Sequence, residues 1–92
     1  REGALARGEE DRFATPLLGA GAYAFDLSGT GDADLYLRIG DAPTTEKWDC
    51  RPFKAGSNER CSISLPAPAI LHGMIRGDAS SSTFSLVASL QQ

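Results

Sequence analysis

Apolar side chains recur at every second position along several short stretches of the chain. Between residues 19 and 29, for example, Tyr23, Phe25 and Leu27 alternate with smaller or polar residues. A period of two places successive side chains on opposite faces of a β-strand. The same pattern predicts strands in further stretches, with the sequences DLYLRIG, KWDCRPF, RCSISLP, AILHGMIRG and STFSLVASL.

No stretch carries a sustained apolar period of about 3.6 residues, so the pattern predicts no helix. About seven or eight short strands with polar turns between them are typical of an antiparallel sandwich or barrel. The 92 residues fit one small domain that spans residues 1–92. Residues 1–8 are charged and rich in Gly and Ala, and we expect them to form a linker or a short edge strand near Leu5.

Charge and hydropathy exclude two classes of partner. The formal net charge is −3 and no face is obviously basic, so nucleic acid is not an expected partner. No apolar run approaches the ~18 residues that a membrane-spanning helix needs, so we expect no membrane span. The chain starts at Arg1 rather than Met and carries no signal-peptide pattern, and we expect a piece of a longer chain.

The two cysteines, Cys50 and Cys61, are too few for a four-ligand zinc site. Cys61 shares the inward face of its expected strand with Ile63 and Leu65, and the connection KAGSNE has the length of a hairpin loop, across which Cys50 could meet Cys61. A disulfide here would stabilise the fold by roughly 3 kcal/mol and implies an oxidising compartment. The alternative is two unpaired, buried thiols in a cytosolic protein.

Several short motifs, taken in their order, resemble those of one family. GDADLYLRIG, APTT, DCRPF, NERC and MIRG follow one another as in the bacterial pre-peptidase C-terminal domain, and the similarity runs from about Leu5 to Ser89. The resemblance implies an antiparallel β-sandwich of jelly-roll type, a disulfide that matches Cys50–Cys61, and an extracellular or cell-surface location. It also implies a domain without catalytic activity of its own that belongs to the precursor of a secreted protease or other exported hydrolase.

The resemblance also carries two binding properties. Some members of the family bind insoluble protein substrates, and some of those bind calcium near the N-terminus. After Pro68 this chain reads AILHGMIRGD, where relatives commonly have aromatic residues. Aromatic side chains supply large contact areas, so we expect weaker substrate binding on this strand than in aromatic-rich relatives.

Asp32 and Asp34 are the first candidates for chemistry. Their i, i+2 spacing places both carboxylates on one face of a strand. A calcium ion takes about six to eight oxygen ligands, so a calcium site would also need Glu9, Glu10 and Asp11 from a folded-back N-terminal segment. In the alternative, the two aspartates only shape the turn before the strand, because an Asp after Gly accepts backbone N–H bonds. No other cofactor is expected.

The candidate ligand-binding residues are Tyr36, Arg38, Trp48, Arg51 and Phe53. Tyr36 and Arg38 face away from the apolar side of their expected strand. Exposed aromatic rings beside arginines would form a shallow patch suited to an insoluble protein or a polysaccharide. In the alternative, Trp48 packs over the disulfide, as large aromatic side chains do in small sandwiches.

We expect no catalytic residues in this chain. Ser62 or Ser64 with His72 and an aspartate would be the elements of a triad, but the strand-to-helix turn that presents a nucleophilic serine is missing. Two functions remain open. The first is a non-catalytic C-terminal accessory domain of a secreted bacterial hydrolase that binds a protein or polysaccharide surface. The second is a folding, secretion or processing appendage that contacts its own parent enzyme and is cleaved off on maturation.

Overall fold

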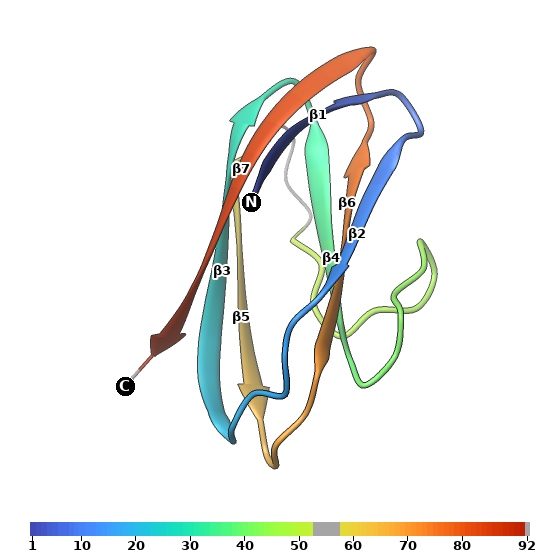
Figure 1. The fold of residues 1–92 in the computed structure, drawn as a ribbon. Coiled ribbons are helices and arrows are strands. Elements are labelled where there is room, and N and C mark those ends of the chain that lie inside the picture. The colour runs from blue at the N-terminus through green and yellow to red at the C-terminus, as the bar shows by residue number, and fades with distance from the viewer. Residues whose placement is uncertain (53–57, 92) are drawn as a thin grey trace.

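Two antiparallel sheets stack face to face in the computed structural model, which describes residues 1–52 and 58–91 (Figure 1). The strands are β1 Glu2–Ala6, β2 Glu10–Ala14, β3 Gly21–Thr30, β4 Ala33–Ile39, β5 Glu59–Leu65, β6 Leu71–Gly77 and β7 Ser81–Gln91. One sheet has the strand order β1-β7-β3-β5 and the other has the order β2-β6-β4. This arrangement confirms the predicted all-β sandwich. Among the described residues no helix is long and apolar enough to cross a membrane.

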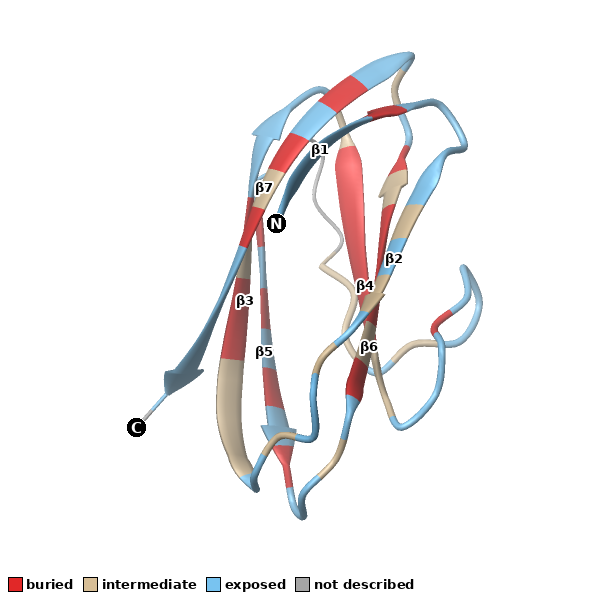
Figure 2. Ribbon diagram, in the orientation of Figure 1, coloured by how far each residue is buried: buried red, intermediate tan, exposed pale blue. Residues whose placement is uncertain are grey.

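The core lies between the inner faces of the two sheets. Figure 2 shows buried and exposed residues alternating along β5 and along the upper half of β7. This alternation confirms the period-two pattern of the sequence, because one face of each strand meets the core while the other meets solvent. The core cluster of buried side chains contains Leu5, Phe25, Leu27, Ala33, Leu35, Leu37, Cys61, Ile63, Leu65, Leu71, Ile75, Phe84 and Leu86.

The N-terminal segment contains two strands, of which the sequence indicated one. The edge strand expected near Leu5 is β1, which pairs with β7. The strand β2 was not predicted, because its sequence EDRFA is mostly charged. Its apolar residue Phe13 packs directly over Gly73, where a side chain would collide with the ring. One well-packed ring and a ladder with β6 are enough to order this charged strand.

The prediction of a strand over KWDCRPF is wrong for the residues that the structure describes. Cys50 forms only an isolated bridge with Leu37 of β4. The segment 40–52 instead lies over the outer face of the three-stranded sheet, where Arg12 Nη1 donates to the Pro43 carbonyl at 2.9 Å. Phe53 and most of the expected hairpin loop lie outside the described residues.

Cys50 and Cys61 form the predicted disulfide, with their Cα atoms 6.1 Å apart. The bond does not cross a hairpin, as the sequence suggested. Cys61 lies in β5 of the four-stranded sheet, whereas Cys50 pairs beside β4 of the other sheet. The disulfide therefore ties together the edges of the two sheets.

Candidate functional site

Four carboxyl groups gather where the turn from β3 to β4 meets the end of β6. Asp34 of β4 and Glu59 of β5 are only 7% and 4% exposed. The carboxyl groups of Asp78 and Glu59 both act on that of Asp34, and Glu59 Oε2 is buried with no hydrogen-bond partner among the described residues. The backbone N–H of Asp78 donates to the carbonyl of Asp32 at 2.8 Å. We call these four residues the acidic corner.

Burial dominates the electrostatics of the acidic corner. Desolvation, followed by the hydrogen bond to Asp78 and the charge of Glu59, raises the pKa of Asp34 to about 8. Desolvation also raises the pKa of Glu59, although the N–H of Leu35 stabilises its charged form. The Arg51 Nη2 atom is 3.9 Å from Asp34 Oδ2. This raised pKa favours the protonated, neutral form of Asp34 at neutral pH.

The N-terminal acids do not join the acidic corner. Glu10, Arg76 and Asp34 form one row across the sheet, so Arg76 lies between the two carboxylates. Arg76 Nη1 contacts Glu10 Oε2 at 2.9 Å, and Arg1 Nη2 contacts Asp11 Oδ1 at 2.6 Å. The fifth calcium candidate, Glu9, has a carboxylate that accepts from its own turn, from the N–H of Ala6.

Within residues 1–52 and 58–91, no three His, Cys, Asp or Glu side chains are placed to hold a metal ion. Arginines occupy two of the N-terminal carboxylates, Glu10 and Asp11, that a calcium ion would otherwise need. The sequence left calcium binding by Asp32, Asp34 and the N-terminal acids open beside the turn, and no observation of the structure tests it.

The turn before β4 is held mainly by the backbone of Asp32. Its N–H donates to Ser82 Oγ at 3.0 Å, and its carbonyl accepts from Asp78. Gly31 precedes it with φ +74°, and a side chain there would meet the Ser81 carbonyl and Ser82. The sequence indicated the turn, but the carboxylate was expected to make these bonds. One of its oxygens, Oδ1, is instead buried with no hydrogen-bond partner among the described residues.

Tyr36, the first residue of the predicted ligand-binding patch, is covered by other residues. The ring of Tyr36 does face away from the core, but it is only 2% exposed, because segment 40–52 lies over it. The Arg51 guanidinium stacks 4.7 Å from the ring centroid, and Arg38 Nη1 donates to the Ala42 carbonyl at 3.3 Å. The expectation of an exposed Tyr36 is therefore wrong. Trp48 is half-buried, and Phe53 lies outside the described residues.

The residues of the considered triad lie on opposite sides of the molecule. Ser62 and Ser64 are exposed on the outer face of β5. His72 lies on the outer face of β6, in the other sheet, beside Arg38 and Ala14. The sandwich core separates the serines from this histidine.

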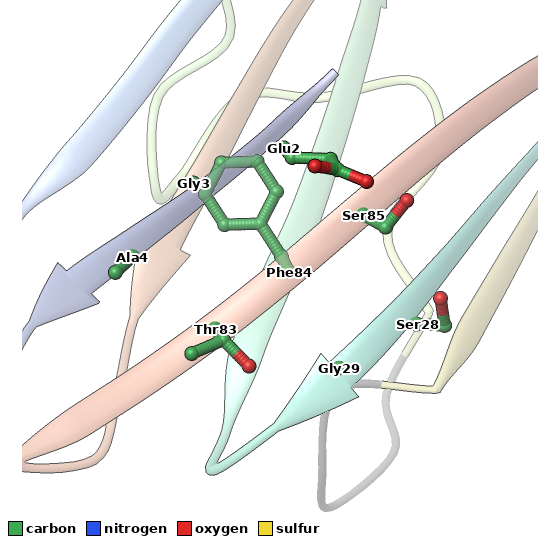
Figure 3. Close-up of a pocket in the computed structure, with 8 residues that line it drawn as sticks. All are labelled: Glu2, Gly3, Ala4, Ser28, Gly29, Thr83, Phe84 and Ser85. Atoms are coloured by element: carbon green, nitrogen blue, oxygen red, sulfur yellow. The ribbon is translucent and has the colours of Figure 1, made fainter.

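The described surface has hollows that were not predicted, among them one of about 300 Å³ between Arg12, Pro43 and His72 and two others. Of these two, the first is a shallow pocket on the four-stranded sheet, bordered by Ser28, Thr83 and Ser85 with Glu2 at one side (Figure 3). Its outward side chains are small apart from Glu2, and the Phe84 ring lies against Gly3 on the core side. Such small side chains offer a ligand little contact area.

The second hollow is an apolar groove of about 270 Å³ at the end of the sandwich where β7 finishes. We call it the terminal groove and define it by Pro16, Leu18, Tyr23, Ala88 and Leu90. The sequence contained a signal for this groove. The period-two pattern of STFSLVASL continues to Leu90, beyond Leu86, where the buried part of β7 ends.

Exposed apolar side chains border the terminal groove. Leu90, one of the lining residues, is 53% exposed, and Leu17, 68% exposed, precedes the lining residue Leu18. Ile70, 39% exposed, follows Ala69, which pairs with Leu18. Val87, 61% exposed on β7, is a further exposed apolar side chain outside the groove lining.

The fold, the inter-sheet disulfide and the buried acidic corner define a small antiparallel β-sandwich domain. Residues 17–68, more than half of the chain, match the model of the family described as the bacterial pre-peptidase C-terminal domain, and the chain belongs to this family.

Its relatives include proteases of several bacteria. The chain is 46% identical over 72 residues to a zinc metalloprotease of Helicobacter pylori, covering 77% of this chain and 28% of that protein. The same identity over 72 residues relates it to the hemagglutinin/proteinase of Vibrio cholerae, with 77% and 12% covered. The chain thus spans less than a third of the length of these curated relatives.

Two solved structures share the fold. The solution structure described as vEP C-ter 100 has a TM-score of 0.72 and 38% identity, with 88% of this chain and 81% of that chain covered. A periplasmic inhibitor of g-type lysozyme from Aeromonas hydrophila has a TM-score of 0.75 and 17% identity, with 99% and 83% covered. The second likeness is one of fold alone.

Proposed function

We propose that this chain is a non-catalytic accessory domain of a secreted bacterial protease and that it packs against its own parent protein through the terminal groove. The observation that carries the proposal is the apolar end of the sandwich, where Leu17 and Leu90 are more than half exposed beside an open groove. Grouped apolar side chains around a groove mark an interaction site more often than scattered ones do.

The relatives give the proposal its context. They are named as proteases, and this chain matches only 28% or 12% of their length. A domain of this size that belongs to a much larger polypeptide has a partner at high effective concentration, so a modest apolar contact is sufficient to hold it.

An extracellular location fits the disulfide. Cys50 and Cys61 are paired, and such bonds persist in oxidising compartments. Among the relatives, one from Xanthomonas campestris is named an extracellular protease. We infer that this chain folds and works outside the cytoplasm.

The binding of an insoluble protein or polysaccharide is the weaker alternative. It requires exposed aromatic rings, and the central ring of the predicted patch, Tyr36, is buried. Arg38 and Arg51 are turned to the Ala42 carbonyl and to Tyr36. The described surface thus favours contact with the parent enzyme.

The test measures binding of the 92-residue chain to its precursor protein lacking these residues. We expect saturable binding by isothermal titration calorimetry, weakened at least about tenfold when Leu17→Ser and Leu90→Ser remove apolar contact area. Ser62→Asn, an exposed change on the outer face of β5, is the matched control and should bind normally.

Retention of the chain on insoluble collagen, chitin or cellulose tests the alternative, surface-binding function. If the chain binds one of these solids, loses that binding with Trp48→Ala and shows none to the parent protein, the surface-binding function replaces ours. Turnover of a peptide or glycoside by the purified chain would contradict both functions.

A further inference from the structure

Among residues 1–52 and 58–91, no strand pairs with the last part of β7 on one of its two sides. β3 pairs with β7 as far as Gln91, whereas β1 pairs with it only over Ser81–Ser85. In Figure 1 the lower part of β7 continues well past the point where the chain begins beside it. We call residues 87–91 of this side the open edge.

The ladder at Arg1 shows which backbone groups the open edge offers. Arg1 N donates to the Leu86 carbonyl at 3.0 Å, and Leu86 N donates to the Arg1 carbonyl at 2.7 Å. Backbone groups along a strand point alternately to its two sides. The N–H and C=O groups of Ala88 and Leu90 therefore point to the open edge, while those of Val87 and Ser89 point to β3.

This edge lacks the features that protect sheet edges in native proteins. Such edges are short, charged, interrupted by proline or covered. The sequence of the open edge, VASLQ, has no charge and no proline. By contrast, the edge of β4 is covered, since the N–H groups of Leu35, Leu37 and Ile39 each have an acceptor.

We propose that the open edge receives an additional β-strand formed by the residues that directly precede Arg1 in the longer polypeptide. This inference rests on the proposed function, because it requires a parent protein attached before Arg1. Arg1 is already hydrogen-bonded to Leu86, and β1 runs antiparallel to β7. A chain that continues β1 backwards therefore lies directly along residues 87–91.

The register fixes the side chains of this added strand. Arg1 lies opposite Leu86, so the second and fourth residues before Arg1 lie opposite Ala88 and Leu90. Residues opposite one another in an antiparallel pair project to the same face. Ala88 and Leu90 project into the terminal groove, so these two positions take apolar side chains, which fill the groove.

Hydrogen exchange followed by NMR tests this assignment. The 92-residue chain is compared with the same chain extended by the natural residues that precede Arg1. The amides of Ala88 and Leu90 should exchange rapidly in the short chain and at least about tenfold more slowly in the extended one. The amides of Val87 and Ser89, which face β3, are internal controls and should be protected in both.

Ala88→Pro removes one N–H from the open edge and leaves the β3 ladder intact, so it should abolish the gain in protection at Leu90. Ser89→Pro removes a β3 bond and should instead destabilise the short chain. Equal exchange of Ala88 and Leu90 in both chains would overturn the added strand.

Other results separate this inference from the proposed function. In one such result, the amides of Ala88 and Leu90 become more protected in the short chain as the protein concentration rises. That result would assign the open edge to a second copy of the chain and overturn the inference. Protection that appears only when the separate parent protein is mixed in would uphold the proposed function and overturn the added strand.

Discussion

The carboxylate of Glu59 and the backbone of Leu35 join the edges of the two sheets. Glu59 Oε1 accepts the Leu35 N–H at 3.0 Å, and both residues are buried. Leu35 belongs to the edge strand β4, so without Glu59 its N–H would be buried with no acceptor. The Cys50–Cys61 disulfide crosses the same boundary, and together the two links close one side of the sandwich.

Glu59→Ala should lower the free energy of unfolding by about 1–3 kcal/mol, the cost of a buried donor that loses its acceptor. Glu59→Gln keeps an acceptor oxygen in the same place and should cost less. Urea denaturation followed by circular dichroism measures both. An equal loss in the two variants would contradict the hydrogen-bond explanation.

Reduction of the disulfide should lower the free energy of unfolding by roughly 3 kcal/mol, because the unfolded chain regains the entropy of an open loop. The measurement is urea denaturation with and without reductant. The double variant Cys50→Ala with Cys61→Ala should be less stable and insensitive to reductant. If the intact mass of the non-reduced protein after alkylation shows two free thiols, the prediction is contradicted.

Stability should fall as the pH rises from about 4 to about 8. The pKa of Asp34 is raised from its ordinary 3.8 to about 8, so in this window the folded state holds a proton that the unfolded state has released. Unfolding then releases a proton, and the free energy of unfolding falls by at most about 1.4 kcal/mol per pH unit. The raised pKa of Glu59 acts in the same direction.

Urea denaturation at pH 5 and at pH 8 measures this effect. We expect greater stability at pH 5, and Asp34→Asn, which stays neutral, should remove most of the difference. The acidic corner would be misassigned if the protein were more stable at pH 8, or if the variant kept the full dependence.

Gly73→Ala should destabilise the protein by about 1–3 kcal/mol, as overpacking does in a filled site. A methyl group at this position would collide with the ring of Phe13, which packs directly over the glycine. Gly19→Ala is the matched control, because nothing lies within 4 Å of its added methyl group. Thermal unfolding compares the two, and a similar melting temperature in both would contradict the packing of β2.

Calcium gives a further test of the N-terminal acids. Arg76 and Arg1 already neutralise Glu10 and Asp11, so we expect the same melting temperature in chelator and in millimolar calcium. A ligand that binds the folded state raises that temperature. A rise that Asp34→Asn abolishes would show that the predicted calcium ligands converge after all.

The sequence pattern predicts a strand correctly where one face of that strand is apolar. β3, β5 and β7 follow the period of two, because their alternate residues meet the core. β2 could not be found in this way, since its Glu10 is stabilised by Arg76, far away in the sequence. Local pattern does not report partners of this kind.

The candidate site was predicted only in part for the same reason. Asp34 stood out in the stretch after Gly31, but Glu59 of β5 and Asp78, which follows β6, carry no local signal. Tyr36 does face away from the core, as its spacing indicated. A loop without regular structure covers it, and no periodicity predicts such a cover.

Hydrogen–deuterium exchange on the 92-residue chain, alone and mixed with its parent protein, tests whether the terminal groove contacts the parent. We expect slower exchange on mixing in residues 15–25 and 86–91, which border the terminal groove, and no change in the exposed outer face of β5. Unchanged exchange around the groove, or protection confined to segment 44–52, would contradict this contact.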